Sequence, residues 1–384
     1  MDKLACGLVL VATLGAGACQ SATLQDEGTA PPYLLEAGGQ PAAIDSAITL
    51  TFPGAEGSGL ILNADICGGE VYLLAPAHKY VQVGDLVSGV VGRHIGKPGN
   101  GPEDFRRPVS LGVDCSARKV YVAEGKGGVL AFRMEDGQYE NTYPHAPEFR
   151  TSMGTRTVVA TDGSGLILSG LWSPQPGHSW TVGDGMFKGH QVGLRLHLSD
   201  PSGRPVAAAY ERDCNTDLTA CLRADVQPID AGGGWVVAHA SSTRIVVLDS
   251  TGAMLRAIDI RSPEFLRDGT TPDEPTEAQL EWGTTNSTIW GLYAIGDRIA
   301  VVHSRNGTKN WRRGQVMQFD VFMNLYSLNG DHLVSDVRLP GLPVGRDGEH
   351  LLVIDYGLAG RRHNATQVTL ARIPLQSGTP VSLQ

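Results

Sequence analysis

The stretch that decides the fold is "IGKPGNGPEDFRRPVSLGVDCSARKVYVAEG", which runs from Ile95 to Gly125. It places glycines and a Pro-Glu-Asp-Phe turn before two short apolar runs that meet at Asp114-Cys115-Ser116. A phosphate-binding loop would need its glycines to open a helix, and no helical pattern follows Gly96, Gly99 and Gly101. The better interpretation is that the stretch is one unit of a repeat.

Five further segments share the pattern of its second half. Each has a turn with Asp or Gly followed by four or five apolar residues, as in "ADICGGEVYLLAP", "TDGSGLILSGL", "IDAGGGWVVAHA", "IGDRIAVVHS" and "GRDGEHLLVIDY". The apolar runs end at equivalent positions, which are Ala75, Glu124, Gly170, His239, His303 and Asp355. Successive ends lie 46 to 69 residues apart, which is the period of a β-propeller blade with insertions.

Turn signals after these runs predict a second hairpin in each unit. They are "QVGD" at 82, "MEDG" at 134, "SDPSG" at 199, "DSTG" at 249 and "LNGD" at 328. Each unit therefore offers four short strands, except the last, Leu342 to Leu375, which shows three. We expect the early segment Ser46 to Phe52 to supply the missing strand and so remove a free sheet edge. The sequence thus predicts an all-β, six-bladed propeller over residues 44–376, followed by a short tail over 377–384.

The quoted stretch also carries a family resemblance. Gly96, Gly99, Gly101, Phe105 and Pro108, followed by "VYVAEG", resemble an NHL-type repeat of bacterial six-bladed β-propellers, and the other units match more loosely. The resemblance implies four-stranded blades in which these glycines shape the loop between two blades. A fold of this kind does not by itself determine the chemistry.

The N-terminal segment "MDKLACGLVLVATLGAGACQS" has the pattern of an export signal. Its apolar run, Leu4 to Ala18, is short for a membrane span. Ala16-Gly17-Ala18-Cys19 resembles the lipobox of bacterial lipoproteins, which implies lipidation of Cys19 and a place in the cell envelope. Ala16 stands where a Leu is usual, so plain secretion is the alternative. Residues 20–43 have the composition of a flexible tether.

Composition excludes one class of partner. Lys and Arg total 31 against 40 Asp and Glu, and the net charge of −9 is spread without long runs, which opposes nucleic-acid binding. The 49 glycines and 22 prolines indicate many tight turns.

The insertions of the repeat predict a binding face. Connections after the second and fourth strands of a blade share one face, and the insertions fall there, at residues 171–191, 262–288, 304–314 and 356–366. Five of the six tryptophans lie in or beside them, namely Trp172, Trp180, Trp282, Trp290 and Trp311. Long loops on a rigid scaffold commonly carry function, and Trp with Arg is typical of binding surfaces. The alternative is that these rings only pack the loops onto the blades.

The candidate ligand-binding residues fall into two groups. The first group includes the residues nearest the starts of first strands, which suit an anionic or aromatic ligand, and these are Arg107, Arg156, Arg223 and Trp290. Trp172 and Trp311 complete this group. The other comprises Glu124, His239, His303 and Asp355, which are ligand types for zinc or for acid-base catalysis. Second strands of adjacent blades stand roughly 12 Å apart, too far for one ion, so a structural role for the second group is favoured.

We therefore expect a monomeric binding module for an envelope protein, peptide or glycan, with no assigned metal or cofactor. The alternative is a metal-dependent enzyme, because propellers of the lactonase and peptidyl-amide lyase kinds hold a metal at the channel mouth. No Gly-x-Ser-x-Gly nucleophile elbow occurs.

Four cysteines remain beyond the signal, an even number that fits two disulfides in an oxidising compartment. Cys214 and Cys221 would close a short loop. Cys67 and Cys115 occupy equivalent first-hairpin turns of neighbouring blades, so we expect a bridge between blades 1 and 2.

Overall fold

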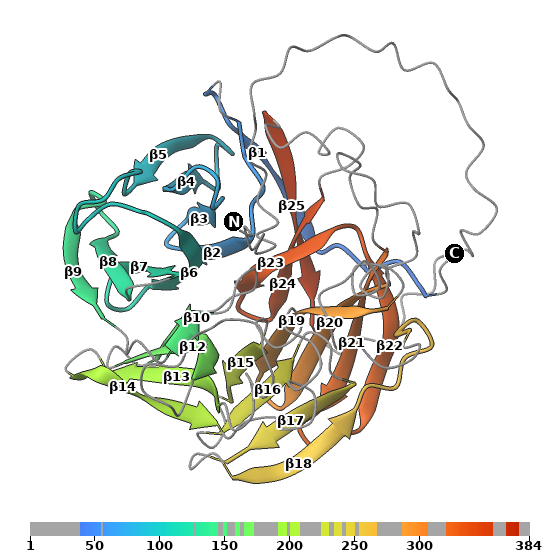
Figure 1. Cartoon of the computed structure of the whole chain (residues 1–384). Helices are drawn as coiled ribbons and strands as arrows, with labels where there is room; N and C mark the ends of the chain where they lie inside the picture. Colours follow the sequence, from blue (N-terminus) through green and yellow to red (C-terminus); the bar gives the residue numbers. More distant parts are fainter. Residues whose placement is uncertain are drawn as a thin grey trace, which may run out of the picture. The chain divides into compact units, whose positions relative to one another are not determined.

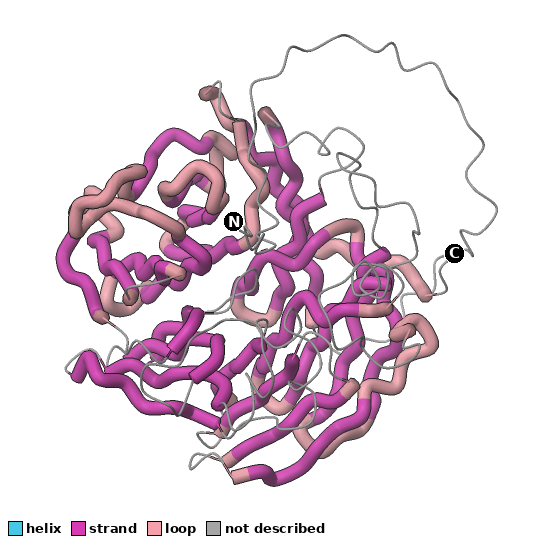
Figure 2. The backbone as a smooth tube through the Cα atoms, viewed as in Figure 1, coloured by secondary structure: helices cyan, strands magenta, loops and turns pink. Residues whose placement is uncertain are grey.

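The computed structural model describes most of the chain from Gly39 onward. The described ranges are 39–54, 57–125, 128–144, 149–151, 158–161, 165–172, 191–197, 200–207, 224–229, 234–239, 243–249, 253–266, 286–305, 320–355 and 366–375. These residues form strands joined by turns and loops, and they include no helix (Figure 2). Within these ranges there is accordingly no helix that could cross a membrane.

The strands form six antiparallel sheets, labelled in Figure 1 and numbered here in chain order. Sheet 1 contains β2 (Asn63–Cys67), β3 (Glu70–Leu74), β4 (Val81–Asp85) and β5 (Val91–Ile95). Sheet 2 contains β6 (Pro108–Asp114), β7 (Lys119–Glu124), β8 (Val129–Arg133) and β9 (Tyr139–Tyr143). Sheet 4 contains β15 (Ala224–Pro228), β16 (Trp235–His239), β17 (Arg244–Leu248) and β18 (Met254–Asp259). Sheet 5 contains β19 (Thr288–Ile295), β20 (Arg298–Arg305), β21 (Asp320–Ser327) and β22 (His332–Leu339).

Sheet 3 departs from the predicted four strands. It contains β10 (Phe149–Thr151), β11 (Val158–Thr161), β12 (Gly165–Trp172), β13 (Gln191–His197) and β14 (Asp200–Ala207). β10 pairs with the last residues of β12, and β11 pairs with the first residues of β12. β13 also pairs with β12. The fifth strand therefore arises because the first strand is interrupted between Thr151 and Val158.

The last sheet, called sheet 6, joins the two ends of the described chain. It contains β23 (Leu342–Asp347), β24 (His350–Asp355) and β25 (Gln367–Pro374), and β1 (Ser46–Thr51) pairs antiparallel with β25. The register runs from Ser46 opposite Arg372 to Thr51 opposite Gln367. The predicted pairing of the early segment with the last unit is thus present. The prediction of an all-β propeller with four-stranded antiparallel blades is confirmed.

Apolar cores lie between neighbouring sheets. One cluster joins Leu74 and Val83 of sheet 1 to Leu111 and Val122 of sheet 2, and comparable clusters join sheets 4 and 5, 5 and 6, and 6 and 1. A central strand is therefore covered on both sides, which explains why the sequence of β7 is continuously apolar rather than alternating. The backbone approaches closely between sheets 6 and 1, because a Cβ at Gly345 of β23 would lie 1.8 Å from the carbonyl oxygen of Ala64 in β2.

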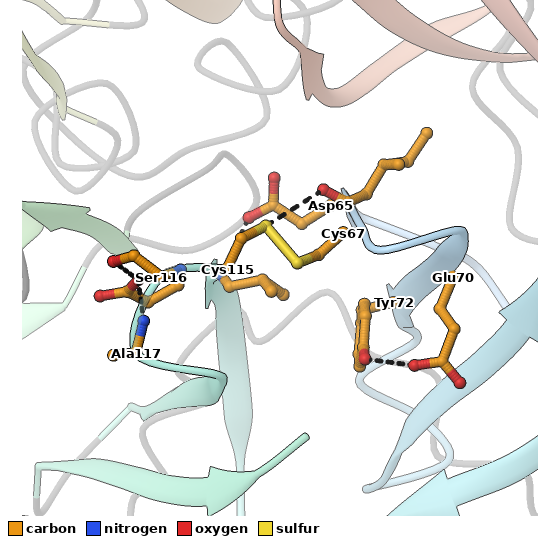
Figure 3. The surroundings of a disulfide bond; sticks show 10 residues. Asp65, Cys67, Glu70, Tyr72, Cys115, Ser116 and Ala117 are labelled. Atoms are coloured by element: carbon orange, nitrogen blue, oxygen red, sulfur yellow. Dashed lines mark hydrogen bonds between the residues drawn. A yellow bond between two sulfur atoms is a disulfide. The ribbon is translucent and has the colours of Figure 1, made fainter. Parts of the chain in front are cut away.

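Sheets 1 and 2 are joined covalently. Cys67, at the end of β2, forms a disulfide with Cys115, in the turn after β6, as predicted (Figure 3). The two Cα atoms are 5.7 Å apart. Beside the bridge, the Asp65 carboxylate accepts a hydrogen bond from the backbone N–H of Val113 at 3.0 Å, so β2 and β6, the first strands of sheets 1 and 2, are also tied together.

A second joint between sheets recurs at their outer strands. Arg93, the third residue of β5, donates to the carbonyl oxygen of Met134 in the β8–β9 turn at 2.7 Å. Arg256, the third residue of β18, donates to the carbonyl oxygen of Asn329 in the β21–β22 turn at 2.8 Å. In both cases the fourth strand of one sheet fixes the outer hairpin of the next.

The segment before β1 differs from the predicted tether at its end. Gln40 and Ala42 exchange backbone hydrogen bonds with Arg338 of β22, at 2.8 and 2.9 Å. Gly39 lies so close to β22 that a Cβ there would be 2.2 Å from the carbonyl oxygen of Asp336, and its φ of 96° also favours glycine. The chain is therefore fixed to sheet 5 before it enters sheet 6, although the tether was predicted to reach residue 43.

Candidate functional site

The long connections of the chain share one end of the sheets, here called the loop-rich end. Strands alternate in direction within each sheet, so connections after second and fourth strands leave from the same end. The strand bounds place residues 173–190, 208–223, 260–287, 306–319 and 356–366 there. At the opposite end, the longest connection that these bounds define is the six residues between Pro228 and Trp235. The predicted position of the insertions in the topology is confirmed, while the conformations of most of their residues lie outside the described ranges.

Two of these connections leave from adjacent points of sheet 5. The ends of the connection between sheets 4 and 5 meet at Leu266 and Ser287. The backbone N–H of Ser287 donates to the carbonyl oxygen of Leu266 at 2.9 Å, and the N–H of Leu266 donates to Ser287 Oγ at 2.8 Å. The connection between β20 and β21 begins after Arg305. Arg305 forms an ion pair with Glu264, and the two side chains are 18% and 11% exposed. A largely buried ion pair therefore fixes the base of one connection to the base of the other.

A buried polar cluster lies beneath these two bases. Its members are His303, Asn324, Asp336, Ser262 and His332. His303 shares its strand face with Ile299 and Val301, which pack toward sheet 4. His303 and Asn324 are fully buried. The cluster therefore continues the apolar seam between sheets 4 and 5 toward the loop-rich end.

Asn324 organises the cluster through both ends of its amide. Its Oδ1 accepts from the backbone N–H of Asp336 at 3.1 Å and from His332 Nε2 at 3.0 Å. Because a backbone N–H can only donate, this fixes which end of the amide is oxygen. Asn324 Nδ2 then donates to His303 Nε2 at 3.0 Å and to Asp336 Oδ1 at 3.3 Å.

This network assigns the protonation of His303. Since Nε2 accepts a hydrogen bond, the ring is neutral and its proton is on Nδ1. Among the described residues, Nδ1 has no hydrogen-bond partner. The ring is held by aromatic contacts instead, edge-on to Phe265 at 5.0 Å and stacked on Phe322 at 5.7 Å between centroids.

Asp336 is the charged centre of the cluster. Burial alone would raise its pKa, but the polar side chains that donate hydrogen bonds to it, among them Ser262, Ser335 and Asn324, lower the pKa to about 2. Ser262 and Ser335 donate their hydroxyls to its two carboxylate oxygens. Its backbone is left-handed, with φ of 50°, which Asp tolerates better than most residues.

The geometry does not form a catalytic triad. In a Ser-His-Asp triad the carboxylate holds one imidazole nitrogen and the serine the other. Here Ser262 and Asp336 both lie on the Nε2 side of His303, at 3.3 and 3.8 Å, and the Ser262 hydroxyl donates to Asp336. Ser262 also accepts from the backbone N–H of Glu264. The cluster therefore holds the start of the connection between sheets 4 and 5 in place.

Glu124 acts as the loop anchor that the sequence favoured. Its Oε2 accepts a hydrogen bond of 2.7 Å from the backbone N–H of Arg107, at the end of the connection from sheet 1. Burial raises the pKa of Glu124, and the backbone N–H groups of Arg107 and Arg106 oppose that rise. The carboxylate thus stabilises the entrance to β6 rather than facing His303 in a common site.

Trp290 occupies a β-bulge near the loop-rich end of β19. Ile289 pairs with His303 and Gly291 with Val302, so the half-buried Trp290 is the extra residue. Equivalent bulges occur in β6 and β23, where Val109 and Val344 are the extra residues. Bulges redirect side chains near functional sites. Sheet 5 differs from the other two in placing a large aromatic at this position.

The remaining predicted site residues are not brought together by the described part of the chain. Arg107 directly precedes β6. Trp172, His239 and Asp355 end β12, β16 and β24, but their side chains are outside the described set. Arg156, Arg223, Trp311, Cys19, Cys214 and Cys221 lie outside the described residues altogether. Within the part that the structure describes, no three His, Cys, Asp or Glu side chains gather as a metal site would require.

Sequence reasoning missed most of the cluster around His303. Asn324, Asp336 and Ser262 lie on a third strand, a fourth strand and a connection, and the repeat alignment marked only second-strand ends. The available signal was polar residues within strongly apolar strands, such as Asn324 within "DVFMNLYS". Such a residue must find partners when buried.

Comparisons with known proteins show the fold and no more. No family model and no curated protein matches the chain. Among solved structures, a member of the DUF4221 family from Bacteroides vulgatus is similar with a TM-score of 0.64 and 9% identity, covering 86% of this chain and 97% of that one. A protein from Bacteroides fragilis, described as exported, is similar with a TM-score of 0.52 and 12% identity, covering 87% of this chain and 98% of that one. At these identities the similarity shows the β-propeller fold alone.

Proposed function

We propose that the chain is an exported, lipid-anchored propeller that binds a partner in the cell envelope through its loop-rich end. In this proposal the six sheets close into a six-bladed ring of NHL-like repeats, with the interrupted first strand of sheet 3 as one member. The pairing of β1 with β25 and the close approach of Gly345 to Ala64 support such a ring. The exported relative in Bacteroides fragilis supports an envelope location.

The observation that carries the binding proposal is the division of connection lengths between the two ends. A propeller that served only as a scaffold would have no need to place every long connection at one end. The bases of two such connections are fixed by Glu264, Arg305 and the His303 cluster, which limits the movement of the loops at their origin. A rigid scaffold that presents long loops is the arrangement used by many binding proteins. The partner classes that we propose are a protein, a peptide or a glycan.

The test is capture of envelope components with matched variants. The double substitution Trp290→Ala and Trp311→Ala should abolish capture of whichever component the wild-type protein retains, while circular dichroism shows an unchanged fold. The control is Val87→Ala, because Val87 is 94% exposed in the β4–β5 turn at the opposite end. Equal capture by all three proteins would contradict binding through the loop-rich end.

The enzyme alternative has its own measurement. Elemental mass spectrometry of the purified protein, before and after mild chelation, would reveal a stoichiometric divalent ion if the chain is a metal-dependent propeller enzyme. A bound ion would favour that alternative.

A further inference from the structure

A cleft of about 350 Å³ lies apart from the sheet 5 cluster, on sheet 2. The connection from sheet 1 contributes Gly96, Lys97 and Glu103, and the β8–β9 hairpin contributes Phe132, Gln138 and Tyr139, with Gly137 completing the lining. This volume is within the range of pockets that hold small molecules.

Two glycines of the lining pack closely against buried side chains. A Cβ at Gly96 would lie 2.6 Å from the ring of Phe105, and one at Gly137 would lie 3.1 Å from Ile95, and both residues have positive φ. The loop wall is held in place because Phe105, fully buried, donates its N–H to the carbonyl oxygen of Lys97 at 2.8 Å. The cleft is therefore bordered by fixed backbone on both sides.

An aromatic series forms one wall. Phe105 packs edge-on against Phe132 at 5.4 Å, and Phe132 packs edge-on against Tyr139 at 5.9 Å between ring centroids. The series runs from the core to the half-buried Tyr139 at the surface. Aromatic faces attract cations and also stack on other rings.

Lys97 and Glu103 are the charged residues of the lining, and the carboxylate of Asp104 lies beside Lys97. Lys97 Nζ lies 2.6 Å from Glu103 Oε1 and 3.8 Å from Asp104 Oδ1, so two carboxylates surround one ammonium. Glu103 is 48% exposed, whereas Asp104 is 13% exposed. Because water screens an exposed ion pair, Glu103 loses little stability if it exchanges Lys97 for another cation. Lys97 then still has Asp104 as its partner.

We propose that this cleft binds a small organic cation, whose primary ammonium pairs with Glu103 and whose aromatic or apolar body packs against Tyr139, behind which Phe132 is buried. Acidic and aromatic groups together are the combination that recognises an ammonium on a hydrocarbon body. The connection 96–107 also leaves from the loop-rich end, but this proposal rests on Glu103 and Tyr139, which the envelope-partner proposal does not use. Either proposal can therefore fail without the other.

The test uses the purified protein and three probes of similar shape in calorimetric titrations. 2-Phenylethylamine carries the ammonium and the ring, 2-phenylethanol is neutral, and phenylalanine adds a carboxylate. We expect saturable binding of the amine and binding of the alcohol that is about tenfold weaker or more, because the alcohol lacks the charge-assisted bond. No saturable binding of the amine would overturn the proposal. Binding of phenylalanine as tight as that of the amine would also overturn it, because the ligand class would then be a zwitterion.

Variants assign the binding to the cleft. Glu103→Gln should weaken binding of the amine about tenfold or more, whereas Glu135→Gln, which changes a surface carboxylate paired with Arg118 outside the cleft, should leave it unchanged. Tyr139→Leu should weaken binding several-fold, and Tyr139→Phe should retain it because the ring remains. Circular dichroism checks the fold of each variant. If Glu103→Gln and Tyr139→Leu both bind the amine like the wild type, the cleft is not the site.

Discussion

At the scale of single residues, one amide determines the state of its neighbours. Asn324 receives the Asp336 N–H on its oxygen, which leaves its nitrogen to donate to His303 and makes that histidine neutral. The sequence identified His303 and Glu124 because they end equivalent apolar runs. The repeat alignment did not mark Asn324, although a polar residue within an apolar strand was a signal for it. The role of Asp336 depends on contacts across strands and not on a position in the repeat.

Asp336 should give the folded state a measurable pH dependence. Its pKa is about 2 when folded, against an ordinary value of 3.8, so its contribution to stability is present above pH 4 and is lost as the pH falls toward 2. The difference corresponds to roughly 2 kcal/mol. Asp336→Asn keeps a residue that tolerates positive φ, and it should lower the free energy of urea unfolding at pH 6. The gap from wild type should narrow at pH 3, and a gap that stays constant would contradict the assignment.

His332 should act in a higher pH window. Burial lowers its pKa below 6.5, so the unfolded chain binds a proton more readily than the folded one. Stability is therefore full above pH 6.5 and declines as the pH falls below it. His332→Gln can still donate to Asn324, and it should reduce the loss of unfolding free energy between pH 7 and pH 5. Urea unfolding at the two pH values measures this loss, and an equal loss in wild type and variant would contradict the role of His332.

At the scale of strands, the repeat pattern located the elements well. The aligned apolar runs end within one residue of the ends of β3, β7, β16 and β24. Turn chemistry explains this success, since Asp114 Oδ1 accepts from the backbone N–H groups of Ser116 and Ala117 and so fixes the turn between β6 and β7. The interruption between β10 and β11 was not predicted. A pattern of apolar runs does not show that two short strands pair with the same longer strand, as β10 and β11 do with β12.

Gly345 provides a prediction about strand contacts. A Cβ there would meet the Ala64 carbonyl oxygen at 1.8 Å, so Gly345→Ala should force β23 away from β2 and lower the free energy of unfolding by about 1–3 kcal/mol. Gly92→Ala is the matched control, since Gly92 also lies in a strand and a Cβ there would have no neighbour within 4 Å. Urea unfolding of the two variants measures both effects. Equal stability of the two would show that the sheets can separate without cost.

At the scale of the whole molecule, neighbouring sheets are joined both at their first strands and at their outer strands. The disulfide and the Asp65 contact tie first strands and their turns, and Arg93 and Arg256 tie outer strands to the next hairpin. The repeat period and the cysteine positions predicted the all-β propeller and the bridge between Cys67 and Cys115. The arginine joints were not predictable, because they bind backbone carbonyl groups that no side-chain motif marks.

The disulfide should contribute more than a local contact. It joins residues 48 positions apart, which corresponds to about 4 kcal/mol in the chain-entropy model. The double variant Cys67→Ser and Cys115→Ser should therefore unfold at markedly lower urea concentration than the oxidised wild type. Added reductant should lower the wild-type midpoint toward that of the variant. A midpoint of the oxidised wild type equal to that of the variant would show that the bridge does not stabilise the fold.

The pairing of β1 with β25 also sets the timing of assembly during protein synthesis. Thr51 and its partner Gln367 are 316 positions apart, so β1 leaves the ribosome long before its partner strand exists. Sheet 6 cannot be completed until β25 has been made, and a nascent or truncated chain that ends before Gln367 carries a β1 without its partner strand. Such a chain offers its backbone to other chains and is a substrate for chaperones and proteases. The pairing that joins the two ends thus makes completion of synthesis a condition for a finished fold.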